Sequence, residues 1–298
     1  MSEPTTVEQE PAGETGENRR EERPDRQVLR FSNLDRVLHI IMIVSFISLA
    51  LTGMTLKFSY TGWANFLAHV FGGFEGAGYI HRVAAVLMFG IFFTHLYNVF
   101  GSKRREAGSL RALLLGPSTM LPTRQDWREF TASMKWFLNL GPRPAYGHWT
   151  YWEKFDYFAV FWGVFVIGST GLTLWFPEFF TNFIPGWFLN VATIIHSDEA
   201  LLAVGFIFTV HFFNTHLRPE KFPMDIVIFT GRVPLDEFEE DRPREFAELK
   251  KQGTLNRHMV EAYQPIVIRA IRTFAWTALL LGFSIIVMII YAMVFAYR

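Results

Sequence analysis

The chain has 298 residues, half of them hydrophobic, with 28 Lys and Arg, 28 Asp and Glu, zero formal net charge and no cysteine. The lack of cysteine excludes disulfides, thiolate-ligated iron–sulfur clusters and a covalently attached c-type haem in this chain. The balanced charge offers no strongly basic surface, so we expect no nucleic-acid partner.

Residues 1–30 are rich in Glu, Arg, Pro and Gly and contain few large apolar residues. Such a composition buries too little apolar surface to support folding, and it lacks the apolar core of a signal peptide. We expect a disordered cytoplasmic tail here.

Five apolar segments follow, each about long enough to cross a bilayer core of roughly 30 Å. They lie near Leu34–Leu56, Tyr79–Phe100, Phe155–Phe176, Ala192–Leu217 and Ile266–Tyr297. Their ends carry Trp and Tyr, which prefer the membrane interface. The sequence therefore predicts an all-α integral membrane protein with about five transmembrane helices and the lipid bilayer as its first partner.

Basic residues are unevenly divided among the connections. Six Lys or Arg precede or include Arg36, nine lie from Lys103 to Lys154, and eight lie from Arg218 to Arg257. The other two connections hold almost none. Because positive charge stays in the cytoplasm, the pattern predicts a multi-pass protein with a cytoplasmic N-terminus. We expect this protein in the bacterial inner membrane.

The two long cytoplasmic connections differ in character. In residues 101–150, the segment Asp126–Leu140 has apolar side chains on one helical face and is expected to lie on the membrane or on a partner. Residues 219–264 are highly charged. Such a stretch is either a solvated surface or a docking surface.

An internal repeat organises the first four segments. Ser45–Phe58 and Val164–Phe176 both contain Thr-Gly-x-Thr-Leu near their ends, and Ile80–His95 and Ile195–His211 both open with Ile-His and close on His. Residues 31–100 and 151–218 are therefore expected to form two parallel repeats, related by a pseudo-two-fold axis along the membrane normal, that build a four-helix bundle. Residues 265–298 form a fifth helix without a counterpart.

Four histidines occupy repeat-related positions at two depths. His81 and His196 are equivalent near the outer surface, and His95 and His211 are equivalent near the inner surface. Fourteen residues of helix separate His81 from His95, about 21 Å. Two imidazoles at each depth are suited to clamp two b-type haems, and Gly90 and Gly205 between the levels are expected to let the macrocycles approach.

These histidines have alternative interpretations as packing residues or as ligands of another metal site. An isolated intramembrane His is often a hydrogen-bonded packing residue, but ionisable groups in a membrane are costly and usually functional. Zinc prefers a compact tetrahedral cluster, and a di-iron carboxylate site needs Glu-x-x-His pairs that the helices lack. His39 is an alternative inner ligand, and together with His216 it leaves room for a third haem.

Four stretches carry a family resemblance: Arg30–His39, Ile80–His95, Tyr151–Pro177 and His211–Gly231. Together, over roughly residues 30–235, they resemble the cytochrome b subunits of membrane-bound formate dehydrogenases and nickel–iron hydrogenases. They look closer still to cytochrome b proteins encoded with multihaem cytochromes in anaerobic respiration. The resemblance implies a di-haem, quinone-linked electron carrier.

The resemblance and the repeat disagree on the inner ligand. In formate dehydrogenase-type subunits, a His matching His39 ligates the inner haem together with a His on the fourth helix. The repeat instead favours His95, as in the cytochrome b of bc complexes, because His95 has a symmetric partner in His211. We expect His95 here. The outer pair is common to both schemes.

A quinone or menaquinone substrate needs a proton carrier close to a haem. Asp198 and Glu199 follow His196 directly and are candidate carriers, although acidic residues near a helix start also complement the helix dipole. An inner site near His39, Arg36 and Asp35 is the alternative. Arg82 is a candidate partner for a haem propionate, although an arginine at a helix end also snorkels toward the interface.

A chain without cysteine needs a redox partner, for which the resemblance suggests a multihaem cytochrome c or an iron–sulfur subunit. Two rival functions remain at this point. A haem-free transporter or proton channel also uses parallel repeats and buried histidines. A structural membrane anchor of a redox enzyme would hold haem that quinol does not reduce.

Overall fold

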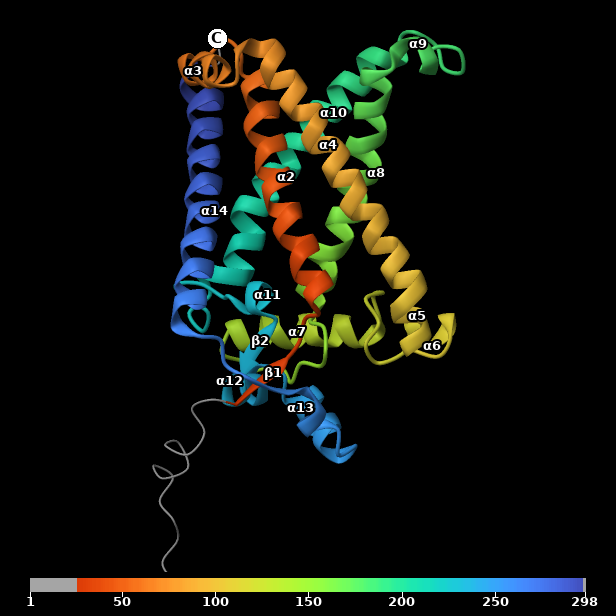
Figure 1. Cartoon of the computed structure of the whole chain (residues 1–298), viewed down its shortest axis with the longest axis vertical. Helices are drawn as coiled ribbons and strands as arrows, with labels where there is room; N and C mark the ends of the chain where they lie inside the picture. Colours follow the sequence, from red (N-terminus) through yellow and green to blue (C-terminus); the bar gives the residue numbers. More distant parts are fainter. Residues whose placement is uncertain (1–25, 297–298) are drawn as a thin grey trace, which may run out of the picture.

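The structure is a computed structural model that describes residues 26–296. Five long helices form the body of the protein. They are α2 (Asn33–Lys57), α4 (Gly73–Asn98), α8 (Tyr151–Trp175), α10 (Phe188–Phe206) and α14 (Pro265–Tyr291). They run along the long axis of the molecule (Figure 1). With their extensions, all five are long and apolar enough to cross a membrane. This confirms the predicted all-α, multi-pass membrane fold.

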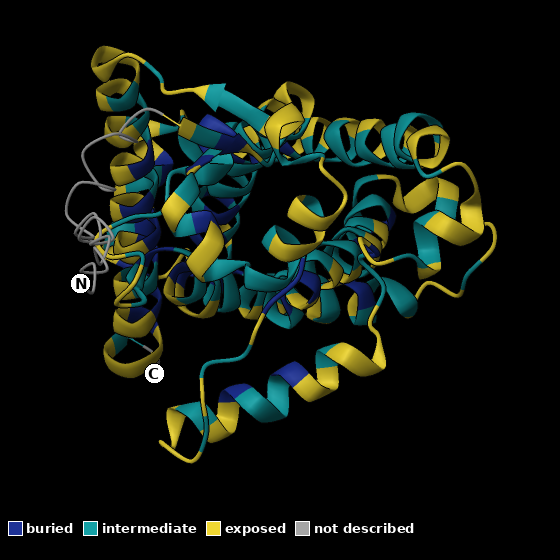
Figure 2. Cartoon of the chain, turned by 90° about the horizontal axis from the view of Figure 1, so that it is seen from below, coloured by how far each residue is buried: buried dark blue, intermediate teal, exposed yellow. Residues whose placement is uncertain are grey.

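Three of these helices continue through π-helical turns. α4 extends through η1 (Val99–Lys103), α10 through η2 (Ile207–His211) and η3 (Phe213–Leu217), and α14 through η5 (Ala292–Ala296). The outward faces of the long helices are exposed and largely apolar, and only a small share of each helix is buried (Figure 2). A bilayer is the solvent in which such a surface is stable.

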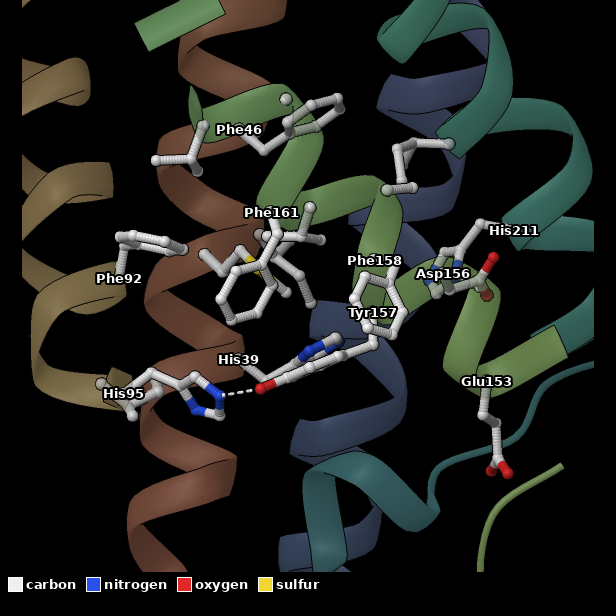
Figure 3. Close-up of a pocket in the computed structure, with 18 of the residues that line it drawn as sticks. His39, Phe46, Phe92, His95, Glu153, Asp156, Tyr157, Phe158, Phe161 and His211 are labelled. Carbon is white, nitrogen blue, oxygen red and sulfur yellow. Dashed lines mark hydrogen bonds and ion pairs between the residues drawn. The ribbon is translucent and has the colours of Figure 1, made fainter. Parts of the chain in front are cut away.

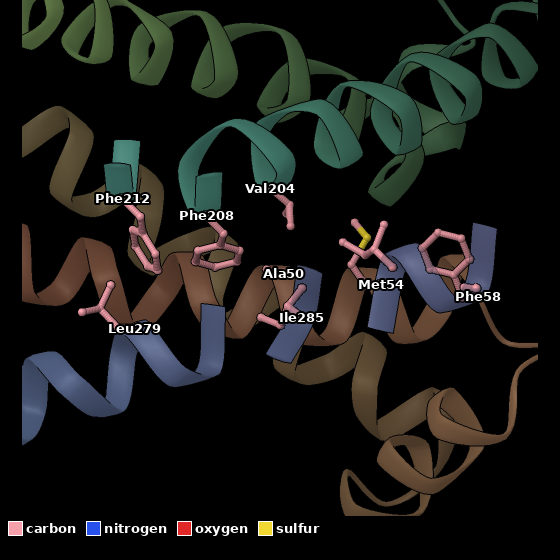
Figure 4. Close-up of a cluster of buried hydrophobic side chains, with 10 residues drawn as sticks. Ala50, Met54, Phe58, Val204, Phe208, Phe212, Leu279 and Ile285 are labelled. Carbon is pink, nitrogen blue, oxygen red and sulfur yellow. The ribbon is translucent and has the colours of Figure 1, made fainter. Parts of the chain in front are cut away.

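The helices pair as the repeat predicts. α2 packs mainly against α4, and α8 packs mainly against α10. The fifth helix, α14, closes the side formed by α2 and η2, where Leu279 and Ile285 join Phe208 and Phe212 in the apolar core (Figure 4). Gly282 permits this contact, because a Cβ there would lie 2.5 Å from the Phe208 ring.

The two ends of the bundle differ. One end, here called the loop end, carries the short helices α3 (Gly62–Val70) and α9 (Pro177–Phe180). The other, here called the platform end, carries the remaining elements (Figure 1). These are β1 (Arg26–Leu29), α5 (Arg104–Glu106), α6 (Leu110–Leu115), α7 (Arg124–Phe137), α11 (Val227–Thr230), β2 (Arg232–Pro234), α12 (Leu235–Asp241), α13 (Pro243–Lys251), η4 (Leu255–His258) and β3 (Met259–Glu261).

The platform contains a small antiparallel sheet in the order β2-β1-β3, which corrects the tail prediction. Residues 26–29 were expected to be disordered, but they form the middle strand. Val28 explains why, since it is buried with Val233 and Phe238. The rest of the predicted tail, residues 1–25, lies outside the described residues.

The predicted amphipathic helix is present as α7, which starts two residues earlier and ends three residues earlier than expected. Its polar face holds it to the protein: Glu129 accepts from Arg244 at 2.7 Å, and Ser133 shares a 2.8 Å hydrogen bond with the Tyr146 hydroxyl. Its apolar face remains exposed, with Trp127 among the exposed side chains.

Ion pairs fasten the platform to the start of α8. Arg242 holds the Glu153 carboxylate with both guanidinium nitrogens, at 2.9 and 2.6 Å. Glu245 accepts from Arg30 at 3.2 Å and pairs with His148 at 2.5 Å. Burial alone would raise the pKa of the Glu245 carboxyl, but His148, Arg30 and Arg242 outweigh it, so that this pKa lies below its ordinary value.

Candidate cofactor-binding cavity

A single large cavity runs through the bundle from the loop end to the platform end. Its volume is about 2010 Å³, whereas a pocket for one drug-sized ligand measures about 300–1000 Å³. Its wall is mostly apolar and includes seven histidines: His39, His81, His95, His148, His196, His211 and His216. Protein interiors are otherwise close-packed, so a cavity of this size suits more than one bulky group.

Near the loop end, two histidines from different repeats face each other. The ring centres of His81 on α4 and His196 on α10 lie 6.1 Å apart, with their planes inclined by 74°. Each ring is held from the neighbouring helix of its own repeat. The His81 Nδ1 lies 3.0 Å from the Thr52 hydroxyl, and the His196 Nδ1 lies 3.3 Å from the Thr170 hydroxyl.

These hydrogen bonds also fix which ring nitrogen carries the proton. The His196 Nδ1 lies 2.9 Å from the carbonyl oxygen of Ile167, which can only accept. Nδ1 is therefore the protonated nitrogen, and Nε2 keeps a free lone pair. The Thr52 hydroxyl donates to the Ser48 carbonyl at 2.6 Å, so it accepts from His81 in the same way. Both imidazoles thus present the nitrogen that a metal ligand requires.

Two glycines make room for these rings. A Cβ on Gly53 would lie 3.3 Å from the His81 Cε1 atom, and a Cβ on Gly171 would lie 2.8 Å from the His196 Cε1 atom. Gly53 and Gly171 are the glycines of the repeated Thr-Gly-x-Thr-Leu motif. The motif therefore has the same function in both repeats. Its first Thr forms a hydrogen bond with the histidine ring, and its Gly leaves space for that ring.

The expectation for Gly90 and Gly205 is corrected. Neither lines the cavity, and a Cβ on either would meet open space. Each follows the first His of its helix by nine residues, which at 100° per residue places it about 180° away, on the opposite face. The sequence spacing gives the correct depth of these glycines along the helix, but their direction around the helix axis points away from the histidines.

At the platform end, the histidines make different contacts. The His211 Nδ1 pairs with the Asp156 carboxylate at 2.9 Å, and His39 lines the same cavity, with its ring centre 6.3 Å from that of Phe229. His95 instead places Nε2 2.9 Å from the Tyr157 hydroxyl. Figure 3 shows Tyr157 reaching from α8 toward His95 on α4, with His211 beside Asp156.

His216 also lies in this region. It is buried and lines the cavity, and its ring centre lies 5.9 Å from that of Phe212. Nearby, the Oδ1 atom of Asp156 and the Nε atom of Arg218 are buried and have no hydrogen-bond partner within residues 26–296. The cavity wall at the platform end therefore offers polar groups to a bound molecule.

The remaining predicted site residues lie near the loop end. Asp198 is largely exposed and pairs with Lys57 at 2.8 Å, so it belongs to the protein surface. Glu199 lines the cavity and accepts a 3.4 Å hydrogen bond from the Trp162 indole. Arg82 also lines the cavity, and its guanidinium carbon lies 5.7 Å from the centre of the Trp175 ring.

Reasoning from the sequence missed four residues that position the histidines: Thr52, Thr170, Asp156 and Tyr157. The two threonines had a signal, because they open the repeated motif. Tyr157 also had a signal, because it stands at the repeat position of His39, whereas Asp156 had none beyond its place in the third segment. No known family model matches the sequence, and none of the curated proteins is detectably similar to it.

Proposed function

We propose that the protein is a di-haem b-type cytochrome. In this proposal it transfers electrons between the membrane quinone pool, for example menaquinone, and a partner redox subunit. The partner is a multihaem cytochrome c or an iron–sulfur protein, because this chain has no cysteine with which to hold such centres itself. The pairing of His81 with His196 carries the proposal.

The spacing of that pair suits one iron between two axial imidazoles. A metal–imidazole bond is about 2 Å long and the ring centre lies about 1 Å beyond the nitrogen, so two axial rings have centres about 6 Å apart. The observed separation is 6.1 Å. Both rings come with Nδ1 hydrogen-bonded and Nε2 free, as ligating histidines do.

For the second haem, the contacts favour His211 with His39. The Asp156 carboxylate holds the His211 Nδ1, which leaves Nε2 for the iron. His39 lines the same cavity as His211 and has no polar partner for its ring within residues 26–296, whereas the Nε2 atom of His95, the ligand favoured by the repeat, is engaged with Tyr157. We therefore assign the second pair to His39 and His211. The buried His216 beside them leaves a third haem open.

Bound haem supplies a one-electron centre at each level. The chain supplies the paired imidazoles, an apolar cavity that keeps water away, and polar groups at both ends. Glu199 is the proposed proton carrier near the loop end, since it faces the cavity, whereas the surface-paired Asp198 is not suited to that role. Arg82 in the same wall is placed to neutralise a propionate.

The orientation follows from charge. Residues 26–36, 103–154 and 218–257, which hold most of the basic residues, gather at the platform end (Figure 1). We propose that this end lies in the cytoplasm and that the protein resides in a bacterial inner membrane.

Haem content tests the proposal. We expect two haems per chain in the purified protein, and we expect His81→Ala or His196→Ala to lose one of them. His69→Ala is the matched control, because His69 is exposed in α3 outside the cavity. A folded protein without haem would refute the proposal and favour the transporter reading. Equal haem content in all three variants would refute the ligand assignment.

A further inference from the structure

The internal repeat also relates residues that line the cavity near the platform end. Thr52 corresponds to Thr170, and the same offset takes His39 to Tyr157. His211 corresponds to His95. The pair formed by His39 and His211 therefore has a symmetry mate, and that mate is the hydrogen-bonded pair of Tyr157 and His95.

This second pair has the form of a binding site for a flat, oxygen-bearing ring. Its polar tip is the 2.9 Å contact between the Tyr157 hydroxyl and the His95 Nε2. Aromatic rings surround the tip: the centre of Phe161 lies 4.8 Å from that of Tyr157 and 5.1 Å from that of Phe92. All four side chains line the large cavity.

The position of the pair also suits a ligand that enters from lipid. α4 and α8 belong to different repeats and pack against each other much less than either packs within its own repeat. The apolar side chain of Phe93, on the same helix as His95, is exposed and does not line the cavity. A 2.9 Å ion pair between Lys103 and Asp35, which also line the cavity, lies toward the platform end.

We propose that Tyr157 and His95 bind the head group of a quinone. The flat ring packs against the aromatic cluster of Phe92 and Phe161, and one quinone oxygen bonds to the Tyr157 hydroxyl or to the His95 imidazole. This inference rests on the proposed function and gives its substrate a place in the fold. It also gives His95 a role other than iron ligation.

Binding of menadione, a naphthoquinone without a tail, tests the inference. Its dissociation constant is measured on the purified full-length protein in nanodiscs by quenching of tryptophan fluorescence, since Trp149 and Trp162 line the same cavity. Tyr157→Phe removes one hydroxyl and keeps the ring, and His95→Gln removes the imidazole. The loss of one hydrogen bond of about 0.5–1.5 kcal/mol weakens binding about 2- to 10-fold.

Two controls accompany the variants. Tyr97→Phe removes a hydroxyl on α4, the helix of His95, at a residue that is 82% exposed, and it should leave the dissociation constant unchanged. Haem content is measured on every variant and should equal that of the unmodified protein. As a second readout, an azido-naphthoquinone should cross-link to peptides that contain residues 92–96 and 157–161.

Three results would overturn the inference. They are unchanged menadione binding in both variants, loss of a haem from His95→Gln, and cross-links confined to the region of Glu199. Failure of the proposed function is distinguishable, because it would appear as absent haem in the unmodified protein. In that case, the menadione binding assay would still test whether Tyr157 and His95 form a quinone site.

Discussion

Substitution of Gly171 by alanine tests how tightly the structure holds His196. The added Cβ would lie 2.8 Å from the His196 Cε1 atom, whereas ordinary contacts lie between 3.4 and 4 Å. The ring must therefore retreat by about 0.6 Å or tilt away from its hydrogen bonds with Ile167 and Thr170. Overpacking of this kind costs about 1–3 kcal/mol, which corresponds to roughly 5- to 150-fold in haem affinity.

Haem titration into the haem-depleted protein measures this change, and the visible spectrum reports whether the remaining ligation is intact. Gly53→Ala should have a smaller effect, because its Cβ would lie 3.3 Å from the His81 ring. Gly90→Ala and Gly205→Ala are matched controls, since both face open space. Unchanged affinity in Gly171→Ala, or an equal loss in the controls, would refute the reasoning.

Three further predictions concern the hydrogen bonds and the platform. Thr170→Val removes a hydroxyl from the His196 Nδ1 and should shift the midpoint potential of the haem nearer the loop end without loss of haem; an unchanged redox titration would contradict this. Arg242→Gln leaves Glu153 without its main ion-pair partner and should lower stability to thermal unfolding by about 3 kcal/mol, unlike the exposed Arg257→Gln. The pKa of Glu245 is lowered in the folded protein, so its contribution to stability is complete above the ordinary carboxyl pKa of about 4 and is lost as the pH falls below it; the protection factors of the α13 amides, corrected for the intrinsic exchange rate at each pH, should fall below pH 4, and equal protection factors at pH 3 and 7 would contradict this.

The fold was largely readable from the sequence because a bilayer imposes long apolar helices. All five predicted spans are present, and the repeat correctly pairs α2 with α4 and α8 with α10. The sheet was missed for a physical reason. Its strands have three or four residues, and the middle strand β1 is more than two hundred positions from either partner in sequence, so the sheet is stabilised by tertiary contacts such as that of Val28 with Val233.

The site was readable in part. The internal repeat predicted the depth of each histidine in the membrane. The contacts of each imidazole also depend on its direction around the helix axis and on side chains from other segments. The choice between His39 and His95 depends on Tyr157 and Asp156, which approach from α8. No spacing within one segment encodes that approach, and the same limitation misplaced Gly90 and Gly205.

A reduced-minus-oxidised visible spectrum, with haem quantified per chain, tests the central claim most directly. We predict a b-type spectrum and two haems per chain, one of which is lost in His81→Ala and in His196→Ala. A correctly folded protein that is colourless would contradict the account, because the paired imidazoles at 6.1 Å would then need another explanation.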